Sequence, residues 1–335
     1  MTDQSTTLLA GDIGGTKTNL ALYNAEIGLT TPLVEATFAS GNFPSLEAVV
    51  QTFLANVDDT YEINRASFGV AGPVIDGQAS VTNLPWEMEE NALAFSLNIP
   101  RVHLLNDLLS IANAVPVLKA DDLATLNQGN PVSQGPIGIV APGTGLGEAF
   151  LVWNGTRYQA YPSEGGHSSF APTTPLQVEM TGYLLDKFGH VSYERVCSGI
   201  GLPNIYQFLK ECAIASEPDW LAQQLAETPD PVPVIVNNAL DEENACEICA
   251  LTLENFVTIL AAEAGNLGLK LLARGGIYLG GGIPPRILSV LKQDRFMTAF
   301  RHKGRFGDLL AEMPVKVILN PKSALLGAAS YGLSH

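Results

Sequence analysis

The stretch LLAGDIGGTKTNLALY runs from Leu8 to Tyr23 and predicts two strands that meet at a glycine turn. Glycines at a turn let the backbone reach positive φ values and let a ligand approach the main-chain N–H groups closely. Such N–H groups form a concave site for phosphate oxygens. Asp12 would repel that anion unless a cation lay between them, and Mg²⁺ binds one or two carboxylates together with substrate phosphates. The alternative is an ordinary tight hairpin with an exposed Asp12.

Two better-known phosphate motifs do not fit this stretch. A P-loop needs G-x-x-x-x-G-K-[ST], and Thr16 stands where the motif has its second glycine. P-loops and Rossmann fingerprints both open a helix, whereas residues 19–23, NLALY, are typical of a strand. The sequence therefore indicates a hairpin loop of a different phosphate-binding architecture.

Composition limits the class of protein. The chain has 335 residues, enough for two domains, and its formal net charge is −16. Such a charge repels nucleic acid and anionic membranes, so we expect neither as a partner. The N-terminus MTDQSTT lacks the features of a signal peptide, and no apolar run approaches the length of a membrane span. Cys246 and Cys249 are interpreted as buried thiols. We expect a cytoplasmic protein.

The pattern of the opening stretch recurs in the middle of the chain. Residues 137–141 form a predicted strand that ends in PGTGLG, and residues 149–152 form the next. A later strand, residues 276–279, leads into Gly280, Gly281 and Gly282. Two strand–glycine loop–strand units predict two α/β halves, related by duplication, with a cleft between them.

Further elements follow from spacing and turn residues. Ser45 is a predicted helix N-cap, and Asp76-Gly77 predicts a hairpin turn. Strands are expected at 33–39, 66–71, 102–105 and 315–319, and helices at 46–57, 108–115, 176–187, 201–212, 219–227, 232–240, 246–273 and 324–333.

Several polar residues lie at a predicted strand end, helix start or loop, where side chains can bind a ligand or take part in catalysis. Asp107 follows a predicted strand and precedes a helix, where an ionised carboxylate is stabilised, although a simple helix cap is the alternative role. Asn106 offers both a donor and an acceptor to a ligand hydroxyl. Glu164 and His167 share a short loop bent by two glycines, and Glu194 lies further on, where by itself it would be interpreted as a surface acid.

Taken together, these motifs resemble the superfamily of sugar kinases, heat-shock ATPases and actin. LLAGDIGGTKTNLALY resembles the first phosphate loop of that superfamily, IGIVAPGTGLGEAFLV the second, and GGIYLGGGIP the adenosine motif. Within it, the segments FGVAGPV, LLNDLLSIANAVP, SEGGHSSFAP and YERVCSGIGLPNIY resemble bacterial-type ATP-dependent glucokinases. The related repressor, open-reading-frame and kinase group carries a Cys-rich zinc motif after its sugar-binding histidine. Nothing similar follows His167, so we place the chain outside that group.

The resemblance implies a fold and an activity. The fold is the α/β two-domain actin-like (ribonuclease H-like) ATPase fold with a cleft between the domains. Residues 1–117 would form the small domain, completed by residues 315–335, and residues 118–314 the large domain. The activity is a glycolytic kinase reaction that transfers the γ-phosphoryl group of ATP to the 6-hydroxyl of D-glucose, giving glucose 6-phosphate and ADP. A homodimer is also implied.

Roles for individual residues follow from the same resemblance. Asp107 would be the catalytic base, and Asp12 would hold Mg²⁺. The expected glucose contacts are Asn83, Asn106, Asp107, Glu164, His167 and Glu194. The expected nucleotide contacts are Gly14, Gly15, Thr16, Gly143, Thr144, Gly145, Gly280, Gly281 and Gly282. Lys17 is expected to be peripheral, because backbone groups of the loop can bind the phosphates.

Two alternatives remain open from the sequence. The protein could phosphorylate another hexose or use polyphosphate or ADP as the phosphoryl donor. It could also be a sugar sensor that binds without turnover. The presence of both Asp107 and Asp12, and the acidic charge, argue against a sensor.

Overall fold

The computed structural model describes residues 7–29, 31–58, 61–81, 84–241 and 243–335. The chain divides into two compact units. Unit 1 comprises residues 1–122 and 320–335, and unit 2 comprises residues 123–319. Each unit is built on its own sheet.

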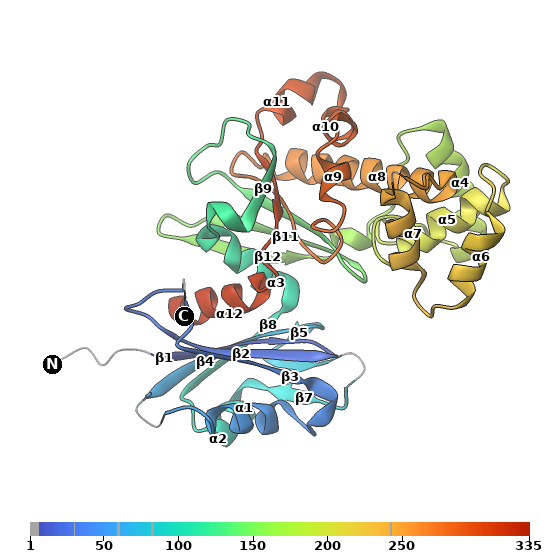
Figure 1. Ribbon diagram of the computed structural model, residues 1–335. Helices are drawn as coiled ribbons and strands as arrows, with labels where there is room; N and C mark the ends of the chain where they lie inside the picture. The colour runs from blue at the N-terminus through green and yellow to red at the C-terminus, as the bar shows by residue number, and fades with distance from the viewer. Residues whose placement is uncertain (1–6, 30, 59–60, 82–83, 242) are drawn as a thin grey trace. The chain divides into compact units, whose positions relative to one another are not determined.

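Unit 1 is a sheet with helices on both faces (Figure 1). Its elements are β1 (Thr7–Ile13), β2 (Lys17–Asn24), β3 (Val34–Ala39), η1 (Ser40–Asn42), α1 (Leu46–Leu54), β4 (Ile63–Val70), β5 (Val74–Ile75), β6 (Gln78–Ser80), β7 (Glu87–Glu89), α2 (Glu90–Leu97), β8 (Arg101–Asn106), α3 (Asp107–Ala114), η2 (Val115–Val117), η3 (Ala120–Asp122) and α12 (Ser323–Ser334). The main sheet has the order β3-β2-β1-β4-β8. The hairpin β1–β2 is antiparallel, and β1, β4 and β8 run parallel.

Alternation along β1 explains why both faces of this sheet are covered. Leu8 and Ala10 pack with residues of α12, whereas Leu9 and Ile13 belong to the core that includes α1 and α2. All four side chains are fully buried. Because successive side chains of a strand point to opposite faces, an almost continuous apolar run suits a strand between two helical layers.

Unit 2 is a second sheet with a larger helical part (Figure 1). Its elements are β9 (Leu123–Asn127), β10 (Ile137–Pro142), β11 (Leu146–Trp153), β12 (Tyr158–Ser163), η4 (Gly165–His167), α4 (Pro175–Phe188), α5 (Gly201–Glu211), α6 (Asp219–Ala226), α7 (Pro231–Leu240), α8 (Glu247–Leu271), β13 (Gly276–Leu279), α9 (Leu288–Leu291), α10 (Asp294–Arg301), η5 (Gly304–Phe306), α11 (Gly307–Ala311) and β14 (Val315–Ile318). The sheet order is β12-β11-β10-β13-β14-β9.

The two sheets share an arrangement. In unit 1 the antiparallel hairpin β1–β2 is followed by the parallel neighbours β4 and β8. In unit 2 the antiparallel hairpin β10–β11 is followed by the parallel neighbours β13 and β14. The predicted repetition of a strand–glycine loop–strand unit is therefore present in the three-dimensional structure.

The division between the units differs from the expected residues. Sequence analysis places the boundaries after residue 117 and before residue 315, whereas the units divide after Asp122 and after Leu319. The reason is strand pairing, because β14 lies between β13 and β9 in the sheet of unit 2. The last strand therefore belongs to unit 2. Only residues 320–335, which contain α12, belong to unit 1.

Helix α8 is the central helix of unit 2. It packs against β10 and β13 and against α5, α7 and α10. By length and hydropathy it could cross a membrane, which contradicts the expectation that no run approaches that length, but 72% of its most apolar window is buried inside the protein. The helix is therefore apolar on nearly all sides because other elements surround it.

Candidate functional site

The turn between β1 and β2 is held by one buried serine. Gly14 N–H donates to the carbonyl of Lys17 at 2.9 Å, which closes the turn. Ser40 Oγ donates to the carbonyl of Gly14 at 2.7 Å, and Ser40 N–H donates to the carbonyl of Thr16 at 3.0 Å. Thr18 Oγ1 lies 3.0 Å from Ser40 Oγ and completes the group. Ser40 therefore holds the shape of the turn by donating to the carbonyls of Gly14 and Thr16.

The glycines of this turn do not have the positive φ values expected for them. Gly14 and Gly15 both have ordinary negative or extended φ. A Cβ on Gly14 would lie 3.0 Å from the carbonyl of Lys17, so close approach within the turn explains this glycine. Ser40 was not identified from the sequence, because it lies 26 residues from Gly14 and only the pairing of β2 with β3 brings it there.

Asp12 and Asp107 lie near each other at one end of the sheet of unit 1. Burial raises the pKa of Asp12, a hydrogen bond from Asn19 Nδ2 at 3.2 Å lowers it, and the charge of Asp107 raises it. Burial likewise raises the pKa of Asp107, although a hydrogen bond from the Leu108 N–H lowers it. Asp12 is partly buried, so the alternative of an exposed hairpin acid does not describe it.

The cap of α3 is Asn106 instead of Asp107. Asn106 Oδ1 accepts from the Leu108 N–H at 3.0 Å, and its Nδ2 donates to the carbonyl of Gly72 at 3.0 Å. Asp107 is the first residue of the helix, and its Oδ1 also accepts from Leu108 at 2.8 Å. The Asp107 carboxyl group therefore lies at the start of the helix, beside the cap.

The second glycine turn is joined to the start of α5. Gly143 N–H donates to the carbonyl of Gly145 at 2.9 Å and closes the turn between β10 and β11. Gly199 N–H then donates to the carbonyl of Gly143 at 2.8 Å, and Ile200 N–H donates to that of Thr144 at 3.2 Å. Each of the two glycine turns is thus supported through its carbonyls by a distant segment.

A cavity of about 420 Å³ adjoins the second turn. It is lined by Gly143, Thr144, Gly199, Ile200, Asp230, Val232, Gly282, Ile283 and Arg286. Three aliphatic side chains give it apolar walls, whereas Asp230 and Arg286 add opposite charges. This combination suits a ligand with a flat apolar ring and polar edges. Sequence analysis identified only Gly143, Thr144 and Gly282 of this lining, because α5, α7 and the segment after β13 meet only in the folded chain.

The three glycines after β13 have different roles. Gly280 N–H donates to the carbonyl of Val140 and continues the strand pairing. Gly281 has φ +80, and a Cβ on it would overlap the carbonyl oxygen of Pro142. Gly282 lines the cavity, and a Cβ there would meet no atom within 4 Å. Among the three, only Gly282 is positioned to contact a ligand in this cavity.

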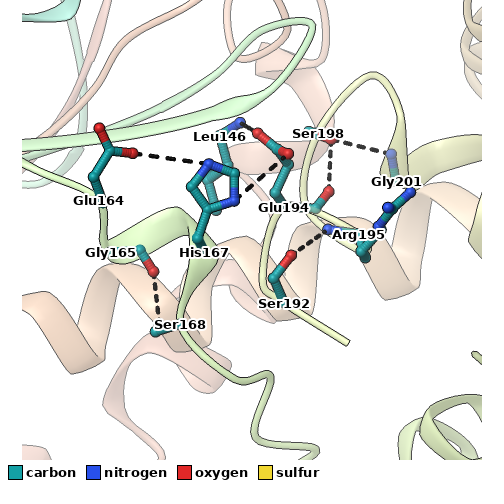
Figure 2. Close-up of polar contacts among 10 residues, drawn as sticks. All are labelled: Leu146, Glu164, Gly165, His167, Ser168, Ser192, Glu194, Arg195, Ser198 and Gly201. Carbon is teal, nitrogen blue, oxygen red and sulfur yellow. Dashed lines mark hydrogen bonds and ion pairs between the residues drawn. The ribbon is translucent and has the colours of Figure 1, made fainter. Parts of the chain in front are cut away.

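Glu164, His167 and Glu194 come together in unit 2 (Figure 2). His167 Nε2 lies 3.8 Å from Glu164 Oε2, and His167 Nδ1 lies 3.9 Å from Glu194 Oε1. These separations exceed hydrogen-bond length, so the three side chains remain available to a ligand. Glu164 is 91% exposed and Glu194 is 23% exposed, so the group ranges from the protein surface inward.

Glu194 connects this group to the second glycine turn. Its Oε2 accepts from the Leu146 N–H at 3.0 Å, directly after the turn, and a Cβ on Gly145 would overlap that oxygen (Figure 2). Its backbone N–H donates to the carbonyl of Gly166 at 2.9 Å. The polar groups that suit hydroxyls and the turn that suits phosphate are therefore parts of one local structure.

Two further sequence-based expectations have different outcomes. Asn83 lies outside the described residues. Cys246 and Cys249 are free and buried, as interpreted from the sequence. Within the described residues, no three His, Cys, Asp or Glu side chains form a group that could hold a metal ion by themselves. Asp12 nevertheless fits Mg²⁺, because this ion takes one or two carboxylates and completes its ligands with phosphate oxygens and water.

Comparison with known proteins identifies the family. A profile described as Glucokinase matches residues 9–335. A glucokinase of Trichormus variabilis is 42% identical over 339 residues, covering 97% of this chain and 98% of the relative. The crystal structure of a glucokinase from an Antarctic psychrotroph is 31% identical, with a TM-score of 0.87, and covers 99% of this chain and 100% of that chain.

A more distant structure shares the fold. A ROK family glucokinase from Streptomyces griseus, solved in complex with glucose and AMPPNP, is 19% identical with a TM-score of 0.64 and covers 99% of this chain and 100% of that chain. The expected α/β two-domain actin-like ATPase fold is thus confirmed. The extent of the family match and the identity to curated relatives lead to one conclusion: the chain belongs to the glucokinase family.

Proposed function

We propose that this protein is an ATP-dependent glucokinase that transfers the γ-phosphoryl group of ATP to the 6-hydroxyl of D-glucose. The observation that carries the proposal is the connection of Glu194 to the second glycine turn. Its carboxylate accepts a hydrogen bond from Leu146, next to Gly145, and faces His167. Hydroxyl-binding groups beside a phosphate-binding turn are what a sugar kinase requires.

Asp107 is the proposed catalytic base. General-base catalysis requires an ionised group within hydrogen-bonding reach of the proton that leaves. Asp107 is the first residue of α3, and the N-terminus of this helix favours its ionised form. In the reaction it would accept the proton of the 6-hydroxyl, so that the oxygen can attack the γ-phosphorus.

Sugar recognition is assigned to five polar residues. Glu164, His167 and Glu194 would bind ring hydroxyls, and Asn106 and Asn83 would add further contacts. Oδ1 of Asn106 already accepts from Leu108, and its Nδ2 already donates to Gly72. A sugar hydroxyl would therefore use the second lone pair of Oδ1 or the second proton of Nδ2. Discrimination would come from pairing each hydroxyl with one polar group, because a missing hydroxyl leaves its partner unpaired.

Nucleotide binding is assigned to the glycine turns. Gly14, Gly15 and Thr16 would bind the γ-phosphate end, and Gly143, Thr144 and Gly145 the other phosphates. The cavity beside Gly282 would take the adenosine. Asp12 would hold Mg²⁺, which neutralises phosphate charge during phosphoryl transfer. The raised pKa values of Asp12 and Asp107 fit this assignment, because a nearby cation would stabilise both ionised forms.

The setting of the reaction is part of the same proposal. A cytoplasmic homodimer that supplies glucose 6-phosphate to glycolysis is consistent with the family. The chain's net charge of −16 agrees with a protein that avoids nucleic acid and anionic lipid.

The test is a coupled assay of purified protein with glucose, ATP and Mg²⁺. We expect phosphorylation of glucose and a much lower kcat/KM for galactose, which differs from glucose at the 4-position. Polyphosphate, ADP and other hexoses serve as competing donors and acceptors in parallel assays. Glucose binding without turnover would identify a sensor, and a preference for another sugar or donor would replace the assigned substrates.

A further inference from the structure

Two glutamates are buried together behind the loop that carries Glu164 and His167. Glu148, on β11, is 1% exposed, and Glu263, on α8, is fully buried. The charge of Glu263 acts on Glu148, and a hydrogen bond between the two carboxyl groups would need a proton on one of them. The roles proposed above use neither residue.

The pair needs a proton. Oε1 of Glu148 and Oε1 of Glu263 are both buried and have no hydrogen-bond partner among the described residues. Two ionised carboxylates in contact would repel each other, and Oε1 of Glu148 would stay buried without a donor, which is costly. One proton between them supplies the missing donor. The pair then titrates as a unit.

Two lysines and one amide lie around Glu263. Lys270 Nζ lies 3.5 Å from Glu263 Oε1, and its side chain is 59% exposed. Asn266 Nδ2 donates to Glu263 Oε2 at 2.8 Å. Lys303 also faces Glu263, although burial lowers its pKa. The remaining titratable neighbours of Glu263 are Tyr193 and Cys197, whose pKa values are raised by burial and by this carboxylate.

Glu148 is in contact with the sugar-binding loop. It pairs with Ser163 across β11 and β12, and its Oε2 lies so close to Gly165 that a Cβ there would overlap it. Gly165 and Gly166 are the residues between Glu164 and His167. A carboxylate that moves toward this loop therefore has no free space to occupy.

Glu263 reaches the other sugar-binding segment. Asn266, which donates to Glu263, also donates to Tyr193 OH at 2.9 Å. Tyr193 N–H donates to the carbonyl of Ser168 at 3.0 Å, and the adjacent Glu194 N–H donates to that of Gly166 at 2.9 Å. The carboxyl pair thus contacts both segments that hold the proposed glucose ligands.

We propose that Glu148 is a positioning residue of the glucose site, and that the proton it shares with Glu263 makes the affinity for glucose depend on pH. The inference rests on the proposed sugar site. When the pair is protonated, Glu148 supports Gly165 without repulsion. When the proton is lost to solvent, both glutamates are negatively charged and repel each other. This repulsion pushes Glu148 against Gly165, and glucose binding weakens.

The pH range of this effect follows from the site. Burial, and then the charge of Glu263, raise the pKa of Glu148 to about 7. Glucose should therefore bind best below about pH 6 and lose affinity up to about pH 8. By linkage, glucose binding near neutral pH should also take up protons.

The experiment is calorimetric titration of glucose, without nucleotide, from pH 5.5 to pH 9. For the wild type we expect the Kd to rise with pH by a factor on the order of five or more. In Glu148→Gln the amide still donates to Glu263 but cannot ionise, so its Kd should be nearly independent of pH. Titrations in two buffers of different ionisation enthalpy should show proton uptake in the wild type alone. Steady-state rates should show the change in the KM for glucose and not in that for ATP.

Controls separate this effect from others. Glu217→Gln removes another largely buried carboxylate of unit 2, which accepts from Tyr206 OH and Lys210 Nζ at 2.7 Å each, and should keep the wild-type pH dependence. Glu148→Gln leaves His167 in place, so a slope that persists in this variant assigns the effect elsewhere and overturns the inference. If Glu148→Gln does not fold, Glu263→Gln serves the same comparison, because it also leaves one ionisable group in the pair.

Failure of the inference is distinguishable from failure of the proposed function. A wild-type protein that binds glucose equally well at all pH values contradicts the inference alone. A wild-type protein that binds no glucose at any pH contradicts the proposed function and the inference with it.

Discussion

Asn106 and Asp107 are adjacent but have separate tasks at the start of α3. Asn106 caps the helix and donates to Gly72, whereas Asp107 is the first helical residue and is proposed as the catalytic base. Both residue types are good N-caps, so the sequence leaves the two roles interchangeable. The structure identifies Asn106 as the cap. Loss of the Asp107 carboxylate should therefore affect chemistry far more than folding.

We expect Asp107→Asn to retain its melting temperature and its affinity for glucose while kcat falls. An amide cannot accept the proton of the 6-hydroxyl, and general-base catalysis contributes about 10²- to 10⁴-fold. Thermal melting, glucose calorimetry and steady-state rates on one purified variant measure the three quantities. Asp219→Asn is a matched control, because Asp219 begins α6 as Asp107 begins α3. An Asp107→Asn enzyme with wild-type kcat would show that Asp107 is not the base.

Asp12→Ala should lose Mg²⁺-dependent turnover while glucose still binds. Asp12 is a partly buried carboxylate beside the first glycine turn, and removing it removes the proposed protein ligand of the ion. Rates at several Mg²⁺ concentrations, together with glucose calorimetry, test this. Turnover with the wild-type dependence on Mg²⁺ would exclude Asp12 from the mechanism.

At the scale of elements, both glycine turns depend on a neighbour that binds their carbonyls. Ser40 does this for the first turn, and Gly199 with Ile200 for the second. A third glycine segment, after β13, approaches the end of β10 from the side. In this segment a Cβ on Gly281 would overlap Pro142, whereas a Cβ on the adjacent Gly282 would meet no atom within 4 Å. Alanine substitutions at the two positions can therefore be compared directly.

Gly281→Ala should destabilise unit 2, whereas Gly282→Ala should not. At Gly281 the φ of +80 and the contact with Pro142 both oppose a Cβ, and such strain costs about 1–3 kcal/mol. At Gly282 a Cβ meets open space but projects where the nucleotide is proposed to bind, so the KM for ATP should rise at unchanged melting temperature. Melting curves and ATP kinetics decide the point. An unchanged KM for ATP in Gly282→Ala would argue against the nucleotide in this cavity.

At the scale of the whole molecule, the buried carboxyl pair should make unfolding depend on pH. The pKa of Glu148 is about 7 in the folded protein and 4.5 when unperturbed, so the folded state binds more protons between these values. The free energy of unfolding must therefore fall as pH rises from about 4.5 to about 7, by on the order of 3 kcal/mol from this group.

Glu148→Gln isolates this contribution from that of other acids. The free energy of unfolding of the variant, relative to that of the wild type, should increase between pH 5 and pH 8. Only the wild type must keep Glu148 protonated or bury a second negative charge as the pH rises. Urea unfolding at both pH values measures the difference. An equal difference at pH 5 and pH 8 would show that Glu148 does not titrate in this range.

Local sequence was sufficient to predict many elements of the fold. The β1–β2 and β10–β11 hairpins, the turn at Asp76-Gly77 and the cap at Ser45 all follow from turn chemistry and spacing over a few residues. Elements without such signals were not predicted, among them α2, β9 and β12. Strand β9 forms because β14 supplies its partner, a pairing across nearly 200 residues that no local pattern encodes.

The amino-acid sequence by itself determined the two glycine turns, the class of fold and the residue types available for phosphate and hydroxyl binding, since each depends on neighbours along the chain. Only the tertiary structure decided that Ser40 holds the first turn, that Glu194 joins the second, and that Glu148 and Glu263 share a buried site. These contacts link residues far apart in sequence. Burial and electrostatic coupling are properties of such neighbourhoods, and they exist only once the chain has folded.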